Sequence, residues 1–358
     1  MVMATTPRPG WATGEPPLVS LVVAMRNEEA AIERCIRSIL DQNYPAPRLE
    51  VFVFDGGSTD RSVEITGRLI ANRPGWYLAD NPRRIQAVAW NLGIARATGD
   101  VIGILSGHAE LGADYVASAV ETLGRTGATM VGGPVRAIGG GRTGEAIALA
   151  TSSPFGVGGA RFHYLEREET VDTVFMGLCR SADYRQFMFD EEMVRNQDDE
   201  LSYRILDAGG SIVCNPAIQS AYRSRSNYRS LWLQYFDYGL WKVRVIQKHP
   251  GQARPRQFVP AALVAATVTV GALAPFSALA RIGAGLIVGM YLVANLGASI
   301  AAVRRARAAL LPYVSLAYAI IHFAYGAGVI AGFVRFAGRW PDGAFPAVAR
   351  SIIRHARS

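Results

Sequence analysis

The chain has 358 residues, enough for one large domain or two smaller ones, and half of them are hydrophobic. Its mean hydropathy of +0.15 is high for a soluble protein, and its net charge is +8. From Gly251 onward there are eleven arginines, no lysine and one aspartate, which leaves −2 for the first 250 residues. Because these arginines bracket apolar runs, they predict contact with anionic membrane lipid and argue against nucleic acid as a partner.

The first seventeen residues are rich in proline and glycine, and we expect residues 1–17 to form a flexible N-terminus. They lack the basic and then apolar pattern of a secretory signal, so residues 18–250 are expected on the cytosolic side of a membrane. Three cysteines, Cys35, Cys179 and Cys214, lie far apart in no metal-binding pattern. They fit a reducing compartment, and their expected role is packing in the core.

Residues 18–105 alternate between short apolar runs and amphipathic segments. The apolar runs predict buried strands, and the segments with apolar residues three and four apart predict helices. This alternation predicts an α/β fold with a mainly parallel sheet, whose ligands would bind at the carboxyl ends of the strands. The expected strands are 18–24, 49–54, 76–79 and 101–105, the expected helices are 28–40, 61–71 and 85–97, and polar clusters follow three strands at 26–28, 55–60 and 106–108.

The segment Asp55–Asp60 (DGGSTD) follows the second expected strand. A carboxylate at a strand end, followed by two glycines, lets backbone N–H groups approach a ligand closely. Asp55 could then accept hydrogen bonds from a nucleobase or a ribose. The same residues also suit an ordinary turn in which Ser58 or Asp60 caps the next helix. The motif alone leaves both interpretations open.

Three long runs near the C-terminus contain no Asp, Glu, Lys or Arg: Phe258–Ala280, Ile282–Val303 and Ala308–Val334. Each is long enough to cross a hydrocarbon core of ~30 Å as a helix. A buried core helix is the alternative, but such helices rarely exceed about 20 residues without a charge. Residues 258–335 are therefore expected to form about three transmembrane helices, followed by a basic tail at 336–358.

The arginines settle the orientation of these runs only in part. If the first run leaves the cytosol and the second returns, Arg304, Arg305 and Arg307 lie inside, as the positive-inside rule prefers. A third full crossing would put five arginines outside, against that rule: Arg335, Arg339, Arg350, Arg354 and Arg357. Either the last run does not cross cleanly or the rule is broken, and the sequence leaves both open.

Several ordered motifs resemble those of the family-2 glycosyltransferases, which have the GT-A fold. They are VVAMRNEE at 22–29, FDGGSTD at 54–60, NPRRIQAVAWNLG at 81–93 and RNQDDELSYR at 195–204. Three further segments look like the exopolysaccharide branch, which includes succinoglycan-type enzymes with hydrophobic C-terminal segments: SPFGVGG at 153–159, QDDEL at 197–201 and YFDYGLWK at 235–242. The resemblance implies a Rossmann-like GT-A domain at 18–225, interfacial amphipathic helices at 226–257 and a helical membrane domain beyond.

The resemblance also implies roles for individual residues. Ala24, Arg26, Glu28 and Asp55 would line the nucleotide pocket, and Arg84 would lie near the donor diphosphate. Arginine suits a phosphate because its planar fork donates two parallel hydrogen bonds. A solvated arginine at a helix start is the alternative for Arg84.

The metal position departs from the family pattern. The family usually has Asp-x-Asp after the fourth strand, where it places a divalent cation on the donor diphosphate, and this chain has Ser106-Gly-His108. Ser106 stands where the first aspartate contacts ribose or metal-bound water, and His108 stands where the second binds the metal. Because imidazole binds Mn²⁺ whereas Mg²⁺ prefers oxygen, we expect Mn²⁺ rather than Mg²⁺ at His108. The alternatives are that His108 only hydrogen-bonds a phosphate or that Glu110 takes part.

By the same resemblance, Asp198 is the catalytic base of the RNQDDELSYR segment. Inverting transfer needs a carboxylate that removes the proton of the acceptor hydroxyl as its oxygen attacks the anomeric carbon. Such general-base help is worth roughly 10²–10⁴-fold in rate. The alternative is a solvated acidic helix start, with Asp198 or Asp199 as its cap.

The stretch Tyr222–Trp241, which Lys242 follows, sets Trp and Tyr beside basic residues, a composition typical of the membrane–water interface. We expect an amphipathic helix on the bilayer that brings the active site to a lipid-linked acceptor. Arg225 and Gln234 are candidates to reach the diphosphate or the acceptor. The Gln-x-x-Arg-Trp motif of processive synthases does not occur at Gln234, which favours addition of a single sugar.

Together these patterns predict an inverting glycosyltransferase at the cell membrane, with its catalytic domain in the cytoplasm. It would move a hexose from a UDP- or GDP-sugar to a polyprenyl-linked acceptor in the synthesis of surface polysaccharide or glycolipid. A polyprenyl-phosphate monosaccharide synthase is one alternative. Because Asp-x-Asp is replaced, a catalytically silent membrane scaffold that binds nucleotide is another, although Asp198 favours catalysis.

Overall fold

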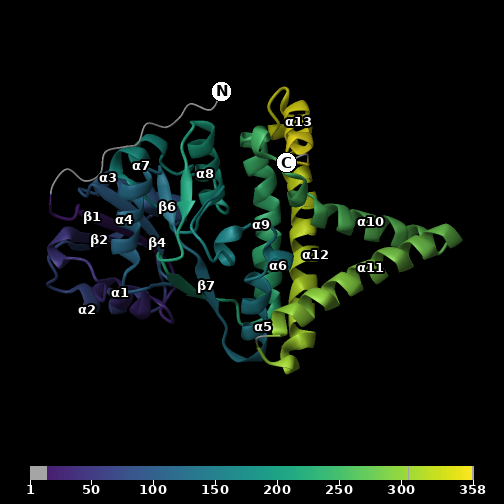
Figure 1. The fold of residues 1–358 in the computed structure, drawn as a ribbon, viewed down its shortest axis with the longest axis horizontal. Helices are drawn as coiled ribbons and strands as arrows, with labels where there is room; N and C mark the ends of the chain where they lie inside the picture. Colours follow the sequence, from purple (N-terminus) through teal and green to yellow (C-terminus); the bar gives the residue numbers. More distant parts are fainter. Residues whose placement is uncertain (1–13, 305, 357–358) are drawn as a thin grey trace. The chain divides into compact units, whose positions relative to one another are not determined.

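The computed structural model describes residues 14–304 and 306–356 (Figure 1). Most of the expected flexible N-terminus therefore lies outside the described residues, as do Arg305 and the last two residues of the expected basic tail, Arg357 among them. The described chain divides into two units, which we describe separately. Unit 1 comprises residues 14–136 and 161–223, and unit 2 comprises residues 137–160 and 224–356.

Unit 1 is built on an eight-stranded sheet with the order β3-β2-β1-β4-β9-β6-β10-β8, in which β9 and β8 run antiparallel to their neighbours and the other strands are parallel. A three-stranded sheet has the order β5-β11-β7. This is the expected α/β fold with a mainly parallel sheet. The strands are β1 Val19–Met25, β2 Leu49–Asp55, β3 Trp76–Asp80, β4 Val101–Ser106, β5 Ala109–Leu111, β6 Met130–Gly132, β7 Val135–Ile138, β8 Glu169–Thr170, β9 Leu178–Arg180, β10 Ile212–Cys214 and β11 Ser220–Arg223.

Helices cover both faces of the large sheet, because the side chains of a buried strand alternate between two apolar layers. In β1, Leu21 and Val23 pack against α1, α2 and α4, whereas Val22 and Ala24 pack against α3, α7 and α8. Figure 1 shows α1 and α2 on one side of the strands and α3, α7 and α8 on the other. These helices are α1 Ile32–Leu40, α2 Ser62–Ile70, α3 Gln86–Arg96, α4 Tyr115–Thr126, α7 Ser181–Phe187 and α8 Gln197–Asp207.

The first helix begins later than its apolar pattern suggests. It was expected from residue 28, but Glu28–Ala31 forms a turn in which the N–H groups of Ala31 and Ile32 both donate to the Glu28 carbonyl, each at 2.8 Å. Asn27 lies in the left-handed region at φ 54°. The chain therefore bends just after β1, and this bend leaves the side chains of residues 26–28 at the edge of the sheet.

A buried carboxylate joins three segments at the amino ends of the central strands. Glu50 of β2 is 8% exposed and accepts hydrogen bonds from Ser20 Oγ, from Thr98 N (2.6 Å) and Oγ1 (3.0 Å), and from Gly99 N (3.1 Å). The turn at Thr98 and Gly99 leads into β4, so one side chain ties β1, β2 and β4 together. A buried charge is tolerated here because donors surround it.

Unit 2 consists of helices. They are α5 Gly141–Thr151, α6 Pro154–Val157, α9 Tyr228–Lys248, α10 Val259–Leu273, α11 Ala278–Val303, α12 Leu311–Arg335 and α13 Ala344–Ala356. Ala146, Ile147 and Ala150 of α5 share one apolar core with Leu231 of α9 and with the inner face of α12. Residues 137–160, which lie inside the domain expected at 18–225, thus group by their contacts with the C-terminal helices, because their apolar face packs there.

Among the residues that the structure describes, the apolar C-terminal region contains two helices long enough to cross a membrane, where about three were expected. They are α11, with 26 residues, and the stretch Ala308–Arg335 that contains α12. The first expected span stops at Leu273 after 15 residues, about 22 Å of helix, and the next helix starts at Ala278. Pro275 explains the break, because proline has no N–H and disfavours helical geometry in the residue before it.

We predict that Glu50→Gln lowers the stability of the folded protein by about 1–3 kcal/mol, because an amide can accept from fewer of the surrounding donors. Thermal unfolding in detergent should show a clear fall in Tm. Glu33→Gln is the matched control, since Glu33 pairs with Arg37 and Arg68 on an exposed surface and its loss should cost less than about 0.5 kcal/mol. Equal Tm values for the two variants would contradict the role given to Glu50.

Candidate functional site

Three loops meet at the carboxyl edge of the large sheet because β1 lies between β2 and β4 in parallel register. Met25 is opposite Asp55, and Ala24 is opposite Ser106. The chain turns stay close to β1, since Gly56 N donates to Met25 O and Gly107 N donates to Ala24 O, both at 2.9 Å. The polar residues after these strands are therefore brought together, as the alternation of strands and helices predicted.

The loop after β1 and the loop after β2 are hydrogen-bonded to each other. Asn27 N donates to Ser58 Oγ at 2.9 Å, Thr59 N donates to Asn27 Oδ1 at 2.8 Å, and Glu28 N donates to Ser62 Oγ at 2.7 Å. Desolvation raises the pKa of Asp60, but hydrogen bonds from Ser62 and from the Glu29 N–H outweigh it and leave that pKa below its usual value. The two loops thus form one fixed rim.

Asp55 stabilises its own turn. Its carboxylate is 6% exposed, and Oδ2 accepts the N–H groups of Gly57 and Ser58, each at 3.0 Å. This is the turn that the sequence also allowed. The turn needs the left-handed backbone of Gly57, at φ +75°.

A carboxylate and an imidazole meet across the first and third loops. Glu28 Oε1 lies 2.8 Å from His108 Nδ1, and both side chains are partly exposed. A His that donates Nδ1–H to a carboxylate keeps its Nε2 lone pair available, which is the arrangement of most histidines that bind metals. Glu28 therefore contacts His108, whereas the resemblance implied only that it lines the nucleotide pocket.

The remaining residues expected at the donor site lie around this pair. Ser106 is 3% exposed, and its Oγ accepts from Gln86 Nε2 at 2.9 Å. Ala24 is buried at the end of β1, and Arg26 is exposed beside Gly56. Glu110 forms an ion pair with Arg34 at 2.7 Å.

The segment after β3 reaches the same edge. Arg84 is exposed, and its guanidinium borders Gly57, where an added Cβ would lie 3.1 Å from Arg84 Nε. Asn81 N donates to Asp55 O at 2.7 Å. The Asn81 side chain is 2% exposed, and its Oδ1 has no hydrogen-bond partner among the described residues, so a buried acceptor lies beside the Asp55 turn.

Asp198 lies in the first turn of α8, where Asp199 N donates to Asp198 Oδ1 at 3.0 Å. The chain leading to α8 is tied to the middle of α3 and to the segment before that helix. Asn91 donates to Phe189 O (2.9 Å) and Glu191 Oε1 (3.0 Å) and accepts from Phe189 N (2.7 Å), and Glu191 also pairs with Arg83. Because Arg83 precedes Arg84, these bonds connect the segment before Asp198 with the edge that carries Asp55.

Arg225 and Gln234 belong to unit 2, where Arg225 Nε donates to Gln234 Oε1 at 3.2 Å. Gln234 Nε2 donates in turn to Tyr238 Oη at 2.9 Å. The two candidates for diphosphate or acceptor contact are thus neighbours of each other on and before α9.

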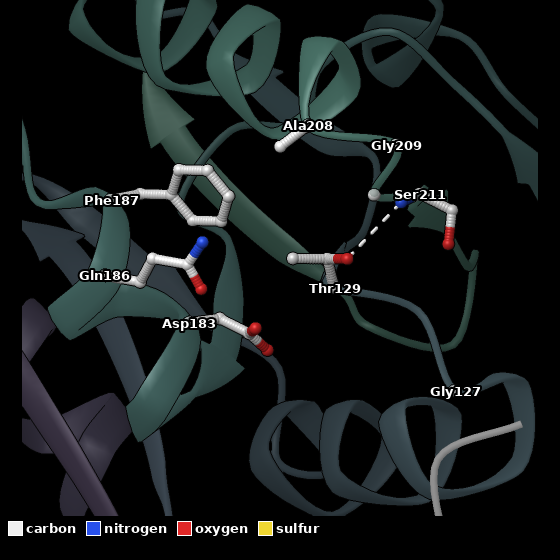
Figure 2. Close-up of a pocket in the computed structure, with 9 residues that line it drawn as sticks. Gly127, Thr129, Asp183, Gln186, Phe187, Ala208, Gly209 and Ser211 are labelled. Carbon is white, nitrogen blue, oxygen red and sulfur yellow. Dashed lines mark hydrogen bonds between the residues drawn. The ribbon is translucent and has the colours of Figure 1, made fainter. Parts of the chain in front are cut away.

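A pocket lies at the opposite edge of the sheet (Figure 2). Gly127 and Thr129 precede β6, and Ser211 precedes β10, so this pocket is at the amino ends of those strands. Thr129 Oγ1 accepts from Ser211 N at 3.3 Å. Ligands of parallel α/β sheets bind at the carboxyl ends, so this pocket is not the candidate site.

The sequence did not identify the side chains that hold other residues of the site in place. Gln86 and Asn91 lie in an ordinary helical pattern, and Glu191 lies in an irregular segment, so only the folded chain gives them partners. The three cysteines are free and buried, which confirms their expected role in the core. Cys35 lies directly behind the site, and burial, helped by the charges of Glu28 and Glu110, raises its pKa to about 12.

Comparison with known proteins shows which family this chain is similar to. The family model described as glycosyl transferase family 2 matches residues 20–188. The succinoglycan biosynthesis protein ExoA of Rhizobium meliloti is 30% identical over 86% of this chain and 92% of its own length. The dolichyl N-acetyl-alpha-D-glucosaminyl phosphate 3-beta-D-2,3-diacetamido-2,3-dideoxy-beta-D-glucuronosyltransferase of Methanococcus voltae is 28% identical over 64% of this chain and 74% of its own length.

Among solved structures, the mannosyltransferase PcManGT of Pyrobaculum calidifontis, in complex with GDP-Man and Mn²⁺, has the same fold. Its TM-score is 0.61 at 19% sequence identity, covering 91% of this chain and 90% of that one. At this identity the likeness concerns the fold alone.

We predict that Asn91→Asp loosens the segment before α8, because a carboxylate cannot donate to Phe189 O and repels Glu191. Losing about 1.4 kcal/mol of local hydrogen bonding would make amide exchange across residues 187–197 about tenfold faster by mass spectrometry. Asn43→Asp, an exposed change of the same kind, should leave that exchange unaltered. Unchanged exchange in Asn91→Asp would refute the tether.

Proposed function

This chain belongs to glycosyltransferase family 2 and is a nucleotide-sugar glycosyltransferase, and on that basis we propose that it transfers a hexose with inversion to a lipid-linked acceptor. The observation that carries the proposal is the meeting of Glu28, Asp55 and His108 at the carboxyl ends of β1, β2 and β4. A nucleoside diphosphate presents a base, a ribose and two phosphates. The three loops at this edge of the sheet offer carboxylates, exposed backbone turns and an imidazole to match these groups.

The donor would lie along this edge, with Asp55, Asn81 and the buried Ala24 near the nucleoside. The unpartnered Asn81 Oδ1 supports this placement, since a ligand N–H or O–H would satisfy it. Arg26 and Arg84 are exposed beside the Gly56–Gly57 turn, where guanidinium groups would offset the charge of the diphosphate. Both a UDP- and a GDP-sugar fit this arrangement.

His108 would hold the divalent cation that neutralises charge on the departing diphosphate. Within the described residues no cluster of three His, Cys, Asp or Glu side chains is able to hold a metal ion. A cation at His108 would thus complete its shell with diphosphate oxygens and water, with Ser106 nearby. An imidazole donor favours Mn²⁺ over Mg²⁺. The solved mannosyltransferase of the same fold contains GDP-Man and Mn²⁺, which supports this choice.

The proposed reaction is a single displacement. Asp198 removes the proton of the acceptor hydroxyl while that oxygen bonds to the anomeric carbon. The bond from this carbon to the diphosphate breaks on the opposite side, and the nucleoside diphosphate leaves with the electron pair. The relative from Methanococcus voltae has a dolichyl-linked sugar phosphate in its name, which supports a lipid-linked acceptor, and ExoA supports a role in polysaccharide synthesis.

Asp198→Asn should lower kcat by roughly 10²–10⁴-fold while nucleotide binding is retained, because the amide cannot take up the proton. The assay follows radiolabelled sugar from UDP- and GDP-sugars into the lipid extract of membranes. Asp207→Asn is the control, since Asp207 is exposed at the far end of the same helix.

Wild-type turnover in Asp198→Asn would exclude it as the base. A labelled monosaccharide phospholipid as the product would favour a polyprenyl-phosphate monosaccharide synthase instead. If no donor is turned over with either metal while nucleotide still binds, the silent scaffold is the better interpretation.

His108→Asp should change the metal preference of donor binding. Nucleotide titrations with Mn²⁺, with Mg²⁺ and with chelator should show the Mn²⁺-to-Mg²⁺ affinity ratio falling by about tenfold, because an oxygen ligand replaces nitrogen. Glu110→Gln is the control, and we expect it to leave the ratio unchanged because Glu110 is paired with Arg34. An unaltered ratio in His108→Asp would mean that His108 is not a ligand.

A further inference from the structure

The two long apolar helices of unit 2 differ in how much of their surface is covered. In the most apolar 18-residue segment of α11, 17% is buried. In the corresponding segment of the stretch that contains α12, 44% is buried. Leu279, Met290 and Val293 of α11 are 79%, 65% and 74% exposed. Val314, Tyr318 and Ile321 of α12 are 2% exposed or less. Although the two helices have similar composition, α12 is a core helix of unit 2 and α11 is not.

Helix α12 is covered by a charged helix. Figure 1 shows α9 and α12 side by side, and three glycines bring their backbones into contact. An added Cβ would lie 2.1 Å from Tyr325 O at Gly239, 2.1 Å from Phe236 O at Gly328 and 2.7 Å from Leu240 O at Gly332. Helix α9 carries five charged side chains along its length: Arg229, Asp237, Lys242, Arg244 and Lys248.

This pairing argues against α12 as a membrane span. Were α12 to cross the bilayer, α9 would cross beside it, and charged side chains at the bilayer centre cost at least about 2.5–3.5 kcal/mol each. The C-terminal end of α12 also contacts a polar side chain of α9, since Gln247 Nε2 donates to the carbonyl oxygen of Phe336 at 2.7 Å. The apolar face of α12 is instead satisfied by the core that it shares with α9 and α5.

Helices α10 and α11 form a hairpin whose arms both start at α12 and meet away from it (Figure 1). Gly326 of α12 touches the first turn of α10, where an added Cβ would lie 2.3 Å from Pro260 O. Near its other end, α11 binds α12 through Asn295 Nδ2, which donates to Ser315 O at 3.0 Å, and through Tyr291 Oη, 3.0 Å from His322 Nδ1. These bonds place Tyr291 and Asn295 on the part of α11 that faces α12.

The outer part of the hairpin presents almost only apolar atoms. At the tip Phe276 is 87% exposed, and along the arms Val268 and Leu286 are 64% and 59% exposed. Between Arg256 and Arg304 the chain has one charge, Arg281, whose Nη1 donates to Ala274 O at 3.0 Å and whose long stem can extend to a headgroup. A soluble surface rarely exposes so much contiguous apolar area, whereas a bilayer would cover it.

Cations lie where the hairpin begins and ends, and after α12. A hydrocarbon-embedded hairpin would hold them at one headgroup layer, where anionic lipid attracts them. They are Arg254 and Arg256 before α10, Arg304 and Arg307 after α11, Arg335 at the end of α12, and Arg339 after it.

We propose that the α10–α11 hairpin alone enters the bilayer and that α12 stays outside the hydrocarbon, so both ends of α12 lie on one face of the membrane. This inference rests on the membrane attachment in the proposed function. It replaces three crossings by one hairpin. It also puts the arginines after α12 on the same side as those after α11, which removes the conflict with the positive-inside rule.

Single cysteines at the two ends of α12 test this arrangement. Ala309→Cys and Gly338→Cys are both at exposed positions, and the native thiols are buried, with burial raising the pKa of Cys214, like that of Cys35, to about 12. In sealed vesicles of one orientation, a membrane-impermeant maleimide should label both variants or neither. Ala71→Cys on unit 1 reports the side of the catalytic unit. Labelling of the two α12 variants from opposite sides would overturn the proposal.

Lipid contact gives a second measurement. A fluorophore at Leu286→Cys should be quenched severalfold more by nitroxide-labelled lipid than one at Ala309→Cys, because only the former would lie in hydrocarbon. Equal quenching would refute insertion of the hairpin. Sugar transfer is measured on the same variants. Absence of transfer together with the expected labelling would count against the proposed function alone. Transfer together with labelling of the two α12 variants from opposite sides would count against the hairpin alone.

Discussion

The candidate site depends on β1 lying in parallel register between β2 and β4. Hydrogen bonds from Gly56 and Gly107 to the last residues of β1 bring the chain after β2 and the chain after β4 to the same place. At the other end, Glu50 holds the start of β4 to β1 and β2 through buried hydrogen bonds. A shift of one residue in any of these strands would exchange its two faces and move the polar residues away from one another.

His108 stands where the family resemblance implied an aspartate, and Glu28 beside it keeps an acidic group at this edge. Glu28 lies across the strand gap and bonds to Nδ1, so the imidazole is oriented and Nε2 is the atom left to face a ligand. In a carboxylate pair both groups would offer oxygen. Here one oxygen group supports a nitrogen group, which is why the expected metal is a transition ion. Cys35 belongs to the core behind the pair, and burial raises its pKa, so it offers no thiolate there.

In unit 2, burial distinguishes the two long apolar helices, which have similar compositions. Helices α11 and α12 have nearly the same hydropathy, but glycines of α12 let α9 approach closely, and the charged side chains of α9 then determine where α12 can lie. The short α10, ended at Pro275, returns into α11 and leaves an apolar hairpin exposed. Segment 137–160 joins this unit because the apolar side of α5 fits the same core.

The sequence by itself determined the order of strands and helices from Leu18 to Ser106, the approximate place of each, and the cluster of polar residues after the strands. Those features follow from local patterns of two and of three to four residues, which the chain carries without folding. Only the tertiary structure decided the partners of Glu28, Glu50 and Asn91, because hydrogen bonds between segments 30 to 100 residues apart leave no local pattern. It likewise decided which apolar helix is covered, since burial depends on the neighbour and not on the helix itself.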